Sequence, residues 1–203
     1  MDDIVRQAMA KWPNVPAVYG WLSLDRRGRW LIKGERITNP VIVDFIGRNY
    51  LHDEQGCWYF QNGPQRVYLA LDYTPFVYHV EGASDANAPL CIAAHNAMPV
   101  ATVNGAWIDE DGSLLLHTEH GIGMMDDRDL DRLLAHFTDA QGKALGEDAI
   151  EVALERLQAG DNTDLHFRYC GKLVPATAAR TRAVPTQFGY VQQPEQPEGQ
   201  EKC

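Results

Sequence analysis

The sequence has no concentration of basic residues. It contains 18 Lys and Arg against 28 Asp and Glu, a formal net charge of −10, and the basic residues are scattered along the chain. Binding to nucleic-acid phosphates or to an anionic membrane surface depends mainly on clustered Lys and Arg. We therefore expect neither a nucleic acid nor a membrane as a partner.

Cysteines are few and widely separated. The four, Cys57, Cys91, Cys170 and Cys203, include no C-x-x-C pair, the spacing typical of a zinc ribbon or a redox motif. We expect them to be reduced thiols. The amino terminus has neither the basic region nor the apolar run and small-residue cleavage site of a signal peptide, so we expect a cytoplasmic protein.

A long uninterrupted hydrophobic run is also missing. The segment 86–108 lacks Asp, Glu, Lys and Arg, but prolines, asparagines, a histidine and a glycine interrupt it. A membrane-spanning helix needs roughly 20 predominantly apolar residues. The segment therefore predicts buried structure in a water-soluble protein, and the composition, 45% hydrophobic and 23% charged, is typical of a folded one.

The common catalytic motifs are absent. The sequence contains no phosphate-binding G-x-x-x-x-G-K-[ST], no G-x-G-x-x-G, no G-x-S-x-G and no H-E-x-x-H. Gly121 and Gly123 favour a helix-entry loop over a phosphate site. On a strand, His117 and His120 would point to opposite faces, which favours a polar turn over a metal site. We expect no metal and no cofactor.

Hydrophobic periodicity predicts a mixture of helices and short strands. Helical spacing occurs over 1–12, from Asn39 and Pro40 onward, from Asp126 or Asp127 to about 137, and over 147–158. Asn39 and Pro40 form an N-cap and first-turn pair. Strand-like runs bounded by turn residues occupy 21–24, 30–32, 58–60, 67–71, 106–108, 114–116, 165–169 and 172–174.

Landmarks of the first half recur in the second at a nearly constant interval. Gly20 and Gly105, Gly28 and Gly112, Ile37 and Ile122, and Gly56 and Gly142 are separated by 84 to 86 residues. We interpret this as an internal duplication; the alternative is two unrelated hairpin-plus-helix units. The predicted fold is α+β, with two similar antiparallel-sheet-plus-helix halves. The expected parts are 1–18 (helix and linker), 19–85 (first half), 86–105 (charge-free connection), 106–191 (second half) and 192–203 (disordered tail).

Candidate binding residues are polar or aromatic side chains beside the expected strand ends. The six chosen are Arg36, Arg66, Asp72, Phe76, Asn96 and His117. The pair His95 and Asn96 interrupts the charge-free segment, so it is either a hydrogen-bonded structural joint, which we favour, or the polar floor of a pocket. Aromatic residues crowd the first half; most belong to a core, and any that face outward would form a binding patch.

The order of several short motifs resembles a bacterial family called domain of unknown function 1285. The likeness covers about residues 28 to 134 and includes a G-x-W at 28–30, a P-F-V at 75–77 and an L-H-x-x-x-G-[LI] at 116–122. The segments 12–16 and 19–22 also resemble uncharacterised proteins of beta-proteobacteria. The resemblance implies two similar halves, each a curved antiparallel sheet with a helix like a pleckstrin-homology module, and a signalling role without a defined activity.

These observations leave more than one function open. The leading hypothesis is a non-enzymatic module that binds a small molecule or a protein in a groove between the halves. Its role would be in signalling or regulation. The rival is a small hydrolase or isomerase with His95 or His117 as general base and Asp72 or another carboxylate as its partner. The third hypothesis is that the protein is a structural subunit of a larger assembly. An enzyme requires an imidazole and a carboxylate that converge in one pocket.

Overall fold

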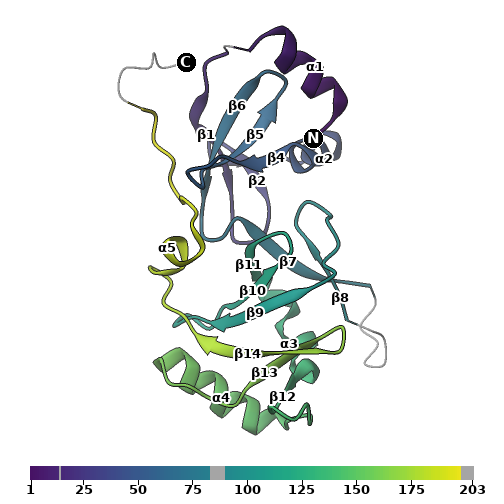
Figure 1. Cartoon of the computed structure of the whole chain (residues 1–203), viewed down its shortest axis with the longest axis vertical. Helices are drawn as coiled ribbons and strands as arrows, with labels where there is room; N and C mark the ends of the chain where they lie inside the picture. The colour runs from purple at the N-terminus through teal and green to yellow at the C-terminus, as the bar shows by residue number, and fades with distance from the viewer. Residues whose placement is uncertain (14, 83–89, 198–203) are drawn as a thin grey trace. The chain divides into compact units, whose positions relative to one another are not determined.

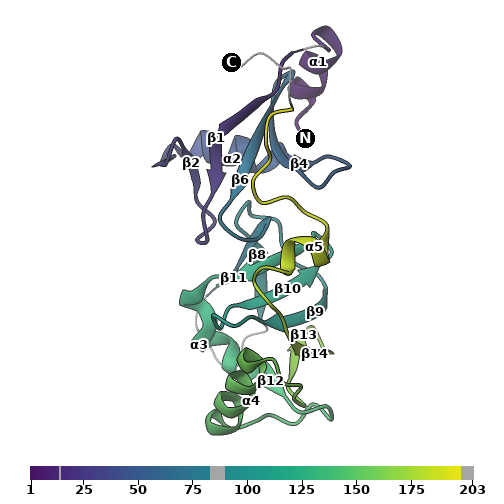
Figure 2. The same ribbon diagram turned by 90° about the vertical axis from the view of Figure 1, so that its left-hand side faces the viewer.

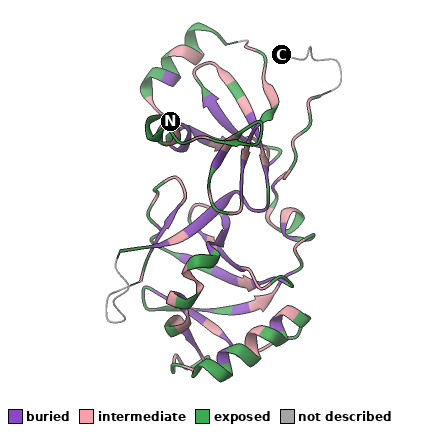
Figure 3. Ribbon diagram, turned by 180° about the vertical axis from the view of Figure 1, so that it is seen from behind, coloured by how far each residue is buried: buried purple, intermediate pink, exposed green. Residues whose placement is uncertain are grey.

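The computed structural model describes residues 1–13, 15–82 and 90–197, and it confirms the α+β class (Figure 1). The chain forms two compact units. Unit 1 comprises Met1–Pro75 and Phe188–Cys203, and unit 2 comprises Phe76–Gln187. Each unit contains one β-sheet, and in the burial colouring of Figure 3 the buried residues concentrate on the strands.

Unit 1 contains a six-stranded sheet in the order β3-β2-β1-β6-β5-β4. Helix α2, Pro40–Arg48, packs one face of it, with the Phe45 ring 5.5 Å from that of Phe60. The Asn39 side chain accepts a hydrogen bond from the Val41 amide, which confirms the predicted cap. The elements are α1 (Asp3–Lys11), β1 (Val18–Leu24), β2 (Trp30–Ile32), β3 (Glu35–Arg36), β4 (Tyr50–His52), β5 (Trp58–Asn62) and β6 (Gln65–Leu71), with α5 (Val184–Phe188) at the boundary of the units.

Unit 2 contains an eight-stranded sheet in the order β12-β13-β14-β9-β10-β11-β7-β8. Its strands are β7 (Phe76–Glu81), β8 (Cys91–Ala94), β9 (Val103–Ile108), β10 (Leu114–Thr118), β11 (Ile122–Met125), β12 (Phe137–Thr138), β13 (His166–Tyr169) and β14 (Lys172–Ala178). Helix α4, Glu147–Ala159, follows the prediction and ends at Gly160, whose left-handed φ of +97° is typical of a helix-terminating glycine.

The two sheets repeat one arrangement of six strands. The order β3-β2-β1-β6-β5-β4 in unit 1 corresponds to β11-β10-β9-β14-β13-β12 in unit 2. In each set the two central strands, β1 with β6 and β9 with β14, are parallel, and the other neighbours are antiparallel. Unit 2 adds β7 and β8 at one edge and α4 between β12 and β13. An internal duplication requires this correspondence; that the units superpose, and that they resemble pleckstrin-homology modules, stay predictions.

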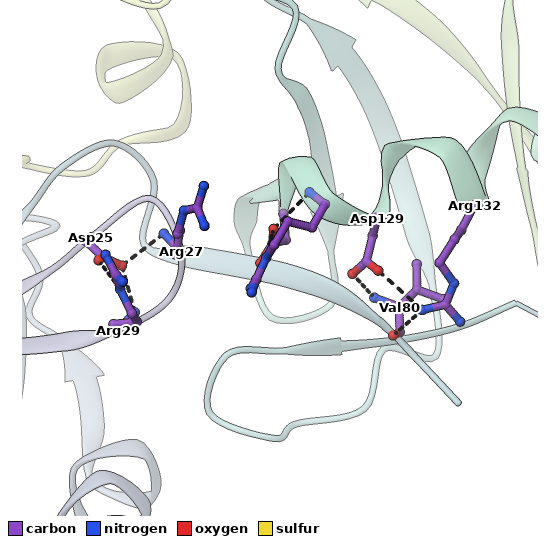
Figure 4. Close-up of polar contacts among 8 residues, drawn as sticks. Asp25, Arg27, Arg29, Val80, Asp129 and Arg132 are labelled. Carbon is purple, nitrogen blue, oxygen red and sulfur yellow. Dashed lines mark hydrogen bonds and ion pairs between the residues drawn. The ribbon is translucent and has the colours of Figure 1, made fainter. Parts of the chain in front are cut away.

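Within the described residues the same aspartate turn occurs four times, twice in each unit. The Oδ1 atom of Asp25, Asp53, Asp109 and Asp139 accepts hydrogen bonds from the backbone amides two and four residues later, at 2.8–3.0 Å. Figure 4 shows this turn at Asp25, with Arg27 and Arg29. A glycine with positive φ stands three residues after each aspartate. A short acceptor side chain and a glycine are the residues that such a turn requires.

Several boundaries differ from the expected ones. Unit 1 ends at Pro75 rather than at 85, because β7 pairs with β11 and β8. Part of the expected connection forms β8, and its residues 86–89 lie outside the described residues. The helix expected from Asp126 is divided into a 3-10 turn (Asp127–Asp129), α3 (Leu130–Leu133) and a second 3-10 turn (Leu134–His136), because Phe137 then enters the sheet opposite Phe167.

The expected disordered tail begins as structured chain. Backbone hydrogen bonds join the Leu71 amide to the Gln192 carbonyl at 2.8 Å and the Val191 amide to the Gly56 carbonyl at 3.0 Å. Residues 198–203 lie outside the described residues. Within the part of the chain that is described, no helix is both long and apolar enough to cross a membrane.

Candidate binding groove

One face of strands β5 and β6 presents two directly opposed pairs of side chains. Tyr59 lies opposite Tyr68, and Gln61 lies opposite Arg66. Because side chains alternate along a strand, these four residues share a face, while Phe60 points to the α2 side. The sheet of unit 1 therefore has an apolar core face and a second face on which aromatic and polar groups are combined.

Ring stacking extends this face onto β1. The Tyr19 ring stacks on the Tyr68 ring with centroids 4.6 Å apart and an interplanar angle of 8°. The Tyr59 and Tyr68 rings lie 5.6 Å apart, and the Arg66 guanidinium lies 4.8 Å from the Tyr59 ring centre. Tyr59 and Tyr68 are buried, Tyr19 is half-buried and Arg66 is exposed. The result is a row of three tyrosines with a cation at its edge.

The Tyr19 and Tyr68 hydroxyls are neutral at pH 7. Burial raises the pKa of Tyr68 to about 12; the Asp53 carboxylate acts in the same direction, and the hydrogen bond with Arg66 opposes it. The Tyr68 hydroxyl donates to Asp53 Oδ2 at 3.0 Å. Burial also raises the pKa of Tyr19. The hydrogen bond with Tyr68 raises the pKa of Arg66, so its guanidinium is charged under all relevant conditions.

These side chains border a groove within unit 1 with a volume of about 1330 Å³. Its other boundaries come from α1 and the segment after it, from the turn that follows β4, and from Pro64 and Pro197. Gln61 is only 1% exposed; its Nε2 donates to the Gly63 carbonyl at 2.9 Å, and its Oε1 has no hydrogen-bond partner among the described residues. The lining also includes Met9, Trp12, Pro13, Val15, Pro16, Ala17, His52, Glu54 and Gln55.

The six residues proposed from the sequence are divided between the two units. Arg36, Arg66 and Asp72 belong to unit 1, and Phe76, Asn96 and His117 to unit 2. Of the six, which all lie within the described residues, only Arg66 lines the groove. Arg36 lies on the edge strand β3, three strands from β6, and Asp72 follows β6. Burial, with repulsion from Asp25, raises the pKa of Asp72.

The residues proposed in unit 2 lie near His95 and His120, two histidines that pack around the start of β7. The buried Phe76 ring is 5.9 Å from the His95 ring and 6.3 Å from the His120 ring. The Val77 amide donates to His95 Nδ1 at 3.3 Å, and the His95 amide donates to the Val77 carbonyl at 2.8 Å. These contacts tie His95 to β7 and support its structural interpretation. Asn96 is in the turn after β8, and His117 is on β10.

Metal ligation finds no support in the part of the chain that the structure describes. No group of three or more His, Cys, Asp or Glu side chains there is arranged to hold an ion. His120 lies beyond the end of β10, in a turn, where its Nε2 is 2.8 Å from the Pro99 carbonyl oxygen. Cys57, Cys91 and Cys170 are free thiols, and Cys203 lies outside the described residues.

Of the residues that line the groove, the sequence singled out Arg66 as a candidate, but not Asp53 or the individual tyrosines beside it. The signal was present in part, because Tyr59 with Gln61 and Arg66 with Tyr68 are spaced two residues apart, which places each pair on one face of a strand. What was missing was the register between β5 and β6, since a shift of one residue would exchange the two faces.

Comparison with known proteins places the chain among proteins of undefined function. The family model DUF2944, described as "Protein of unknown function (DUF2946)", matches residues 1–195. A solved DUF1285 family protein from Silicibacter pomeroyi DSS-3 is similar in structure, with a TM-score of 0.53 and 15% identity over 88% of this chain and 97% of that one. Another from Shewanella baltica OS155 has a TM-score of 0.40 and 13% identity over 55% and 91%. No curated protein matches the chain. The Silicibacter pomeroyi structure thus confirms the resemblance to the DUF1285 family for the fold.

Proposed function

This chain belongs to the DUF2944 family of proteins of unknown function, and we propose that it is a binding module that holds an extended, proline-containing peptide in the groove of unit 1. The observation that carries the proposal is the row of stacked Tyr19, Tyr68 and Tyr59 rings with the Arg66 guanidinium at its edge. Proline-rich segments dock onto aromatic-lined grooves because their extended form is already ordered before binding.

The chemistry of the groove suits such a peptide in two respects. The half-buried Tyr19 ring provides an apolar surface for a prolyl ring, and the buried Tyr68 ring stacks against it. An extended polyproline-type chain has no internal hydrogen bonds, so its amides and carbonyls need partners. The exposed, charged Arg66 guanidinium stands beside the tyrosines and donates to such a carbonyl.

A catalytic role has weaker support. The hydrolase or isomerase hypothesis requires an imidazole within hydrogen-bond reach of a substrate proton. His95 Nδ1 already accepts from the Val77 amide. In the groove, Asp53 accepts from two backbone amides and from Tyr68, and His52 Nδ1 lies 3.0 Å from the Asp53 carbonyl oxygen. These contacts engage His95, His52 and Asp53 in structural bonds, which favours binding over catalysis at these residues.

The proposal is tested with fluorescein-labelled decapeptides that carry the P-x-x-P spacing and matched decapeptides with alanine at each proline. We expect polarisation to detect the proline series only, and Tyr19→Ala to weaken binding by about fivefold, because one aromatic contact contributes on the order of 1 kcal/mol. The control is Trp21→Ala, an exposed aromatic on the same strand that is not part of the groove lining. Equal binding of both peptide series, or equal effects of Tyr19→Ala and Trp21→Ala, would reject the groove.

A further inference from the structure

The C-terminal segment of the chain runs toward this groove. We propose, on the basis of the proposed function, that residues 192–197 are its intramolecular occupant and compete with any peptide that binds from solution. Residues 194–197 have the sequence Pro-Glu-Gln-Pro, with two prolines three residues apart. Of this segment, Pro197 borders the groove, although its own side chain is exposed.

The segment is anchored at one end of the β5–β6 pair. Val191 forms an isolated parallel bridge with Cys57, and the Val191 amide donates to the Gly56 carbonyl. One residue later the Gln192 carbonyl accepts from the Leu71 amide, and Gln192 Nε2 donates to the Tyr73 carbonyl at 3.3 Å. The chain therefore leaves these anchors in a defined position on unit 1, beside β6 (Figure 2).

Beyond the anchors, burial alternates residue by residue. Gln192, Pro194 and Gln196 are half-buried, whereas Gln193, Glu195 and Pro197 are exposed. A period of two is the pattern of an extended chain with one side against a surface. Five extended residues span about 16 Å, close to the length of strand from Leu71 to Arg66. The segment is therefore long enough to pass from its anchors to the tyrosine row.

Tethering makes a weak contact effective. A flexibly linked segment acts at an effective concentration on the order of millimolar. The fixed φ of the prolines reduces the entropy lost on docking. A ligand in solution then binds only the fraction of molecules whose groove is open, so its apparent affinity falls by that fraction. The tail would thereby set the threshold at which an external proline-containing peptide is bound.

The alternation supplies a matched pair of full-length variants. The inward variant carries Pro194→Ser and Gln196→Ser, and the outward variant carries Gln193→Ser and Glu195→Ser. The probe is a fluorescein-labelled peptide with the sequence of residues 190–197. We expect the inward variant to bind the probe at least tenfold more tightly than the wild type does, and the outward variant to match the wild type. Adding Tyr19→Ala to the inward variant should remove the gain.

A second readout does not depend on a peptide in solution. If the tail covers the groove, the NMR amide resonances of Arg66 and Tyr68 should shift in the inward variant and stay in place in the outward one. Inward and outward variants that match in both measurements overturn the intramolecular occupancy. If the proline decapeptides nevertheless bind all three proteins equally, the proposed function stands without the tail. If the resonances shift but no variant binds any peptide, the tail contact is real and the proposed function fails.

Discussion

At the scale of single residues, the four aspartate turns differ mainly in burial. The Asp109 side chain is fully buried and Asp139 is half-buried, although each accepts from two backbone amides. Hydrogen bonds to a charged acceptor contribute about 1.5–3 kcal/mol, and more is lost when the donors stay buried.

We therefore expect Asp109→Ala to lower the free energy of unfolding by about 2–3 kcal/mol and Asp139→Ala by about 1 kcal/mol. Urea denaturation followed by circular dichroism measures both. Equal losses at the two positions would contradict the role assigned to burial.

Asp126 makes stability depend on pH in a defined direction. The hydrogen bond from the Arg128 guanidinium, helped by the Arg128 backbone amide, lowers the pKa of Asp126 from 3.8 to about 2. The folded-state pKa lies below the unfolded value, so the contribution is complete above about pH 4 and is lost as the pH falls toward 2.

Because Arg128 is largely solvent-exposed, we expect a contribution of about 1 kcal/mol. Asp126→Asn should be less stable than the wild type at pH 6, and the difference should shrink as the pH approaches 2. Urea midpoints at pH 2.5, 4 and 6 check this, with Asp131→Asn, an exposed acidic residue on α3, as the control. A difference that is constant with pH would show that the charge is not the cause.

At the scale of elements, the segment around α3 completes the hydrogen bonding of β7. Strand β11 pairs with β7 only as far as Tyr78. Beyond it, the Val80 amide donates to Asp129 Oδ2 at 2.8 Å, and Arg132 donates to the Val80 carbonyl at 3.0 Å (Figure 4). Arg132 also donates to the Gly82 carbonyl at 3.0 Å. The Asp129 and Arg132 side chains thus supply the hydrogen bonds that a neighbouring strand would otherwise give to this end of β7.

We expect Arg132→Ala to destabilise unit 2 by about 1–2 kcal/mol, because the buried Val80 carbonyl loses its donor. Arg132→Lys, which keeps a charge and one donor, should lose less. Hydrogen exchange at the amides of residues 78–82 should accelerate in the alanine variant more than exchange on β13 and β14. Uniform acceleration over the whole sheet would argue against a local role.

At the scale of the whole molecule, the net charge of −10 opposes polyanionic partners. Binding to a phosphate backbone gains most of its free energy from counterions that clustered Lys and Arg release. We expect no mobility shift with a 30-base-pair duplex, and no cosedimentation with phosphatidylserine vesicles, at 150 mM salt. Saturable binding that weakens as salt is raised would refute this expectation.

The repeated strand order is a second property of the whole chain, and the sequence indicated it only indirectly. Offsets of 84 to 86 residues between turn landmarks suggested two related halves, and the strand order of the two sheets agrees with that suggestion. In a crystal structure, β1–β6 should superpose on β9–β14 with the aspartates of corresponding turns, Asp25 with Asp109 and Asp53 with Asp139, in equivalent positions. If the strands do not superpose, the two units share only their topology and the duplication hypothesis is not supported.

The local chemistry of the sequence by itself determined the turns, the Asn39 cap, helix α4 and most of the strands. Those features depend on residues a few positions apart: an aspartate followed by a glycine, a capping amide before a proline, apolar spacing along one face. Only the tertiary structure decided that β7 belongs to unit 2, that β5 and β6 pair in the register that unites Tyr59, Tyr68 and Arg66, and that Tyr19 joins them from β1. Register and strand order arise from contacts between distant segments, which no local pattern specifies.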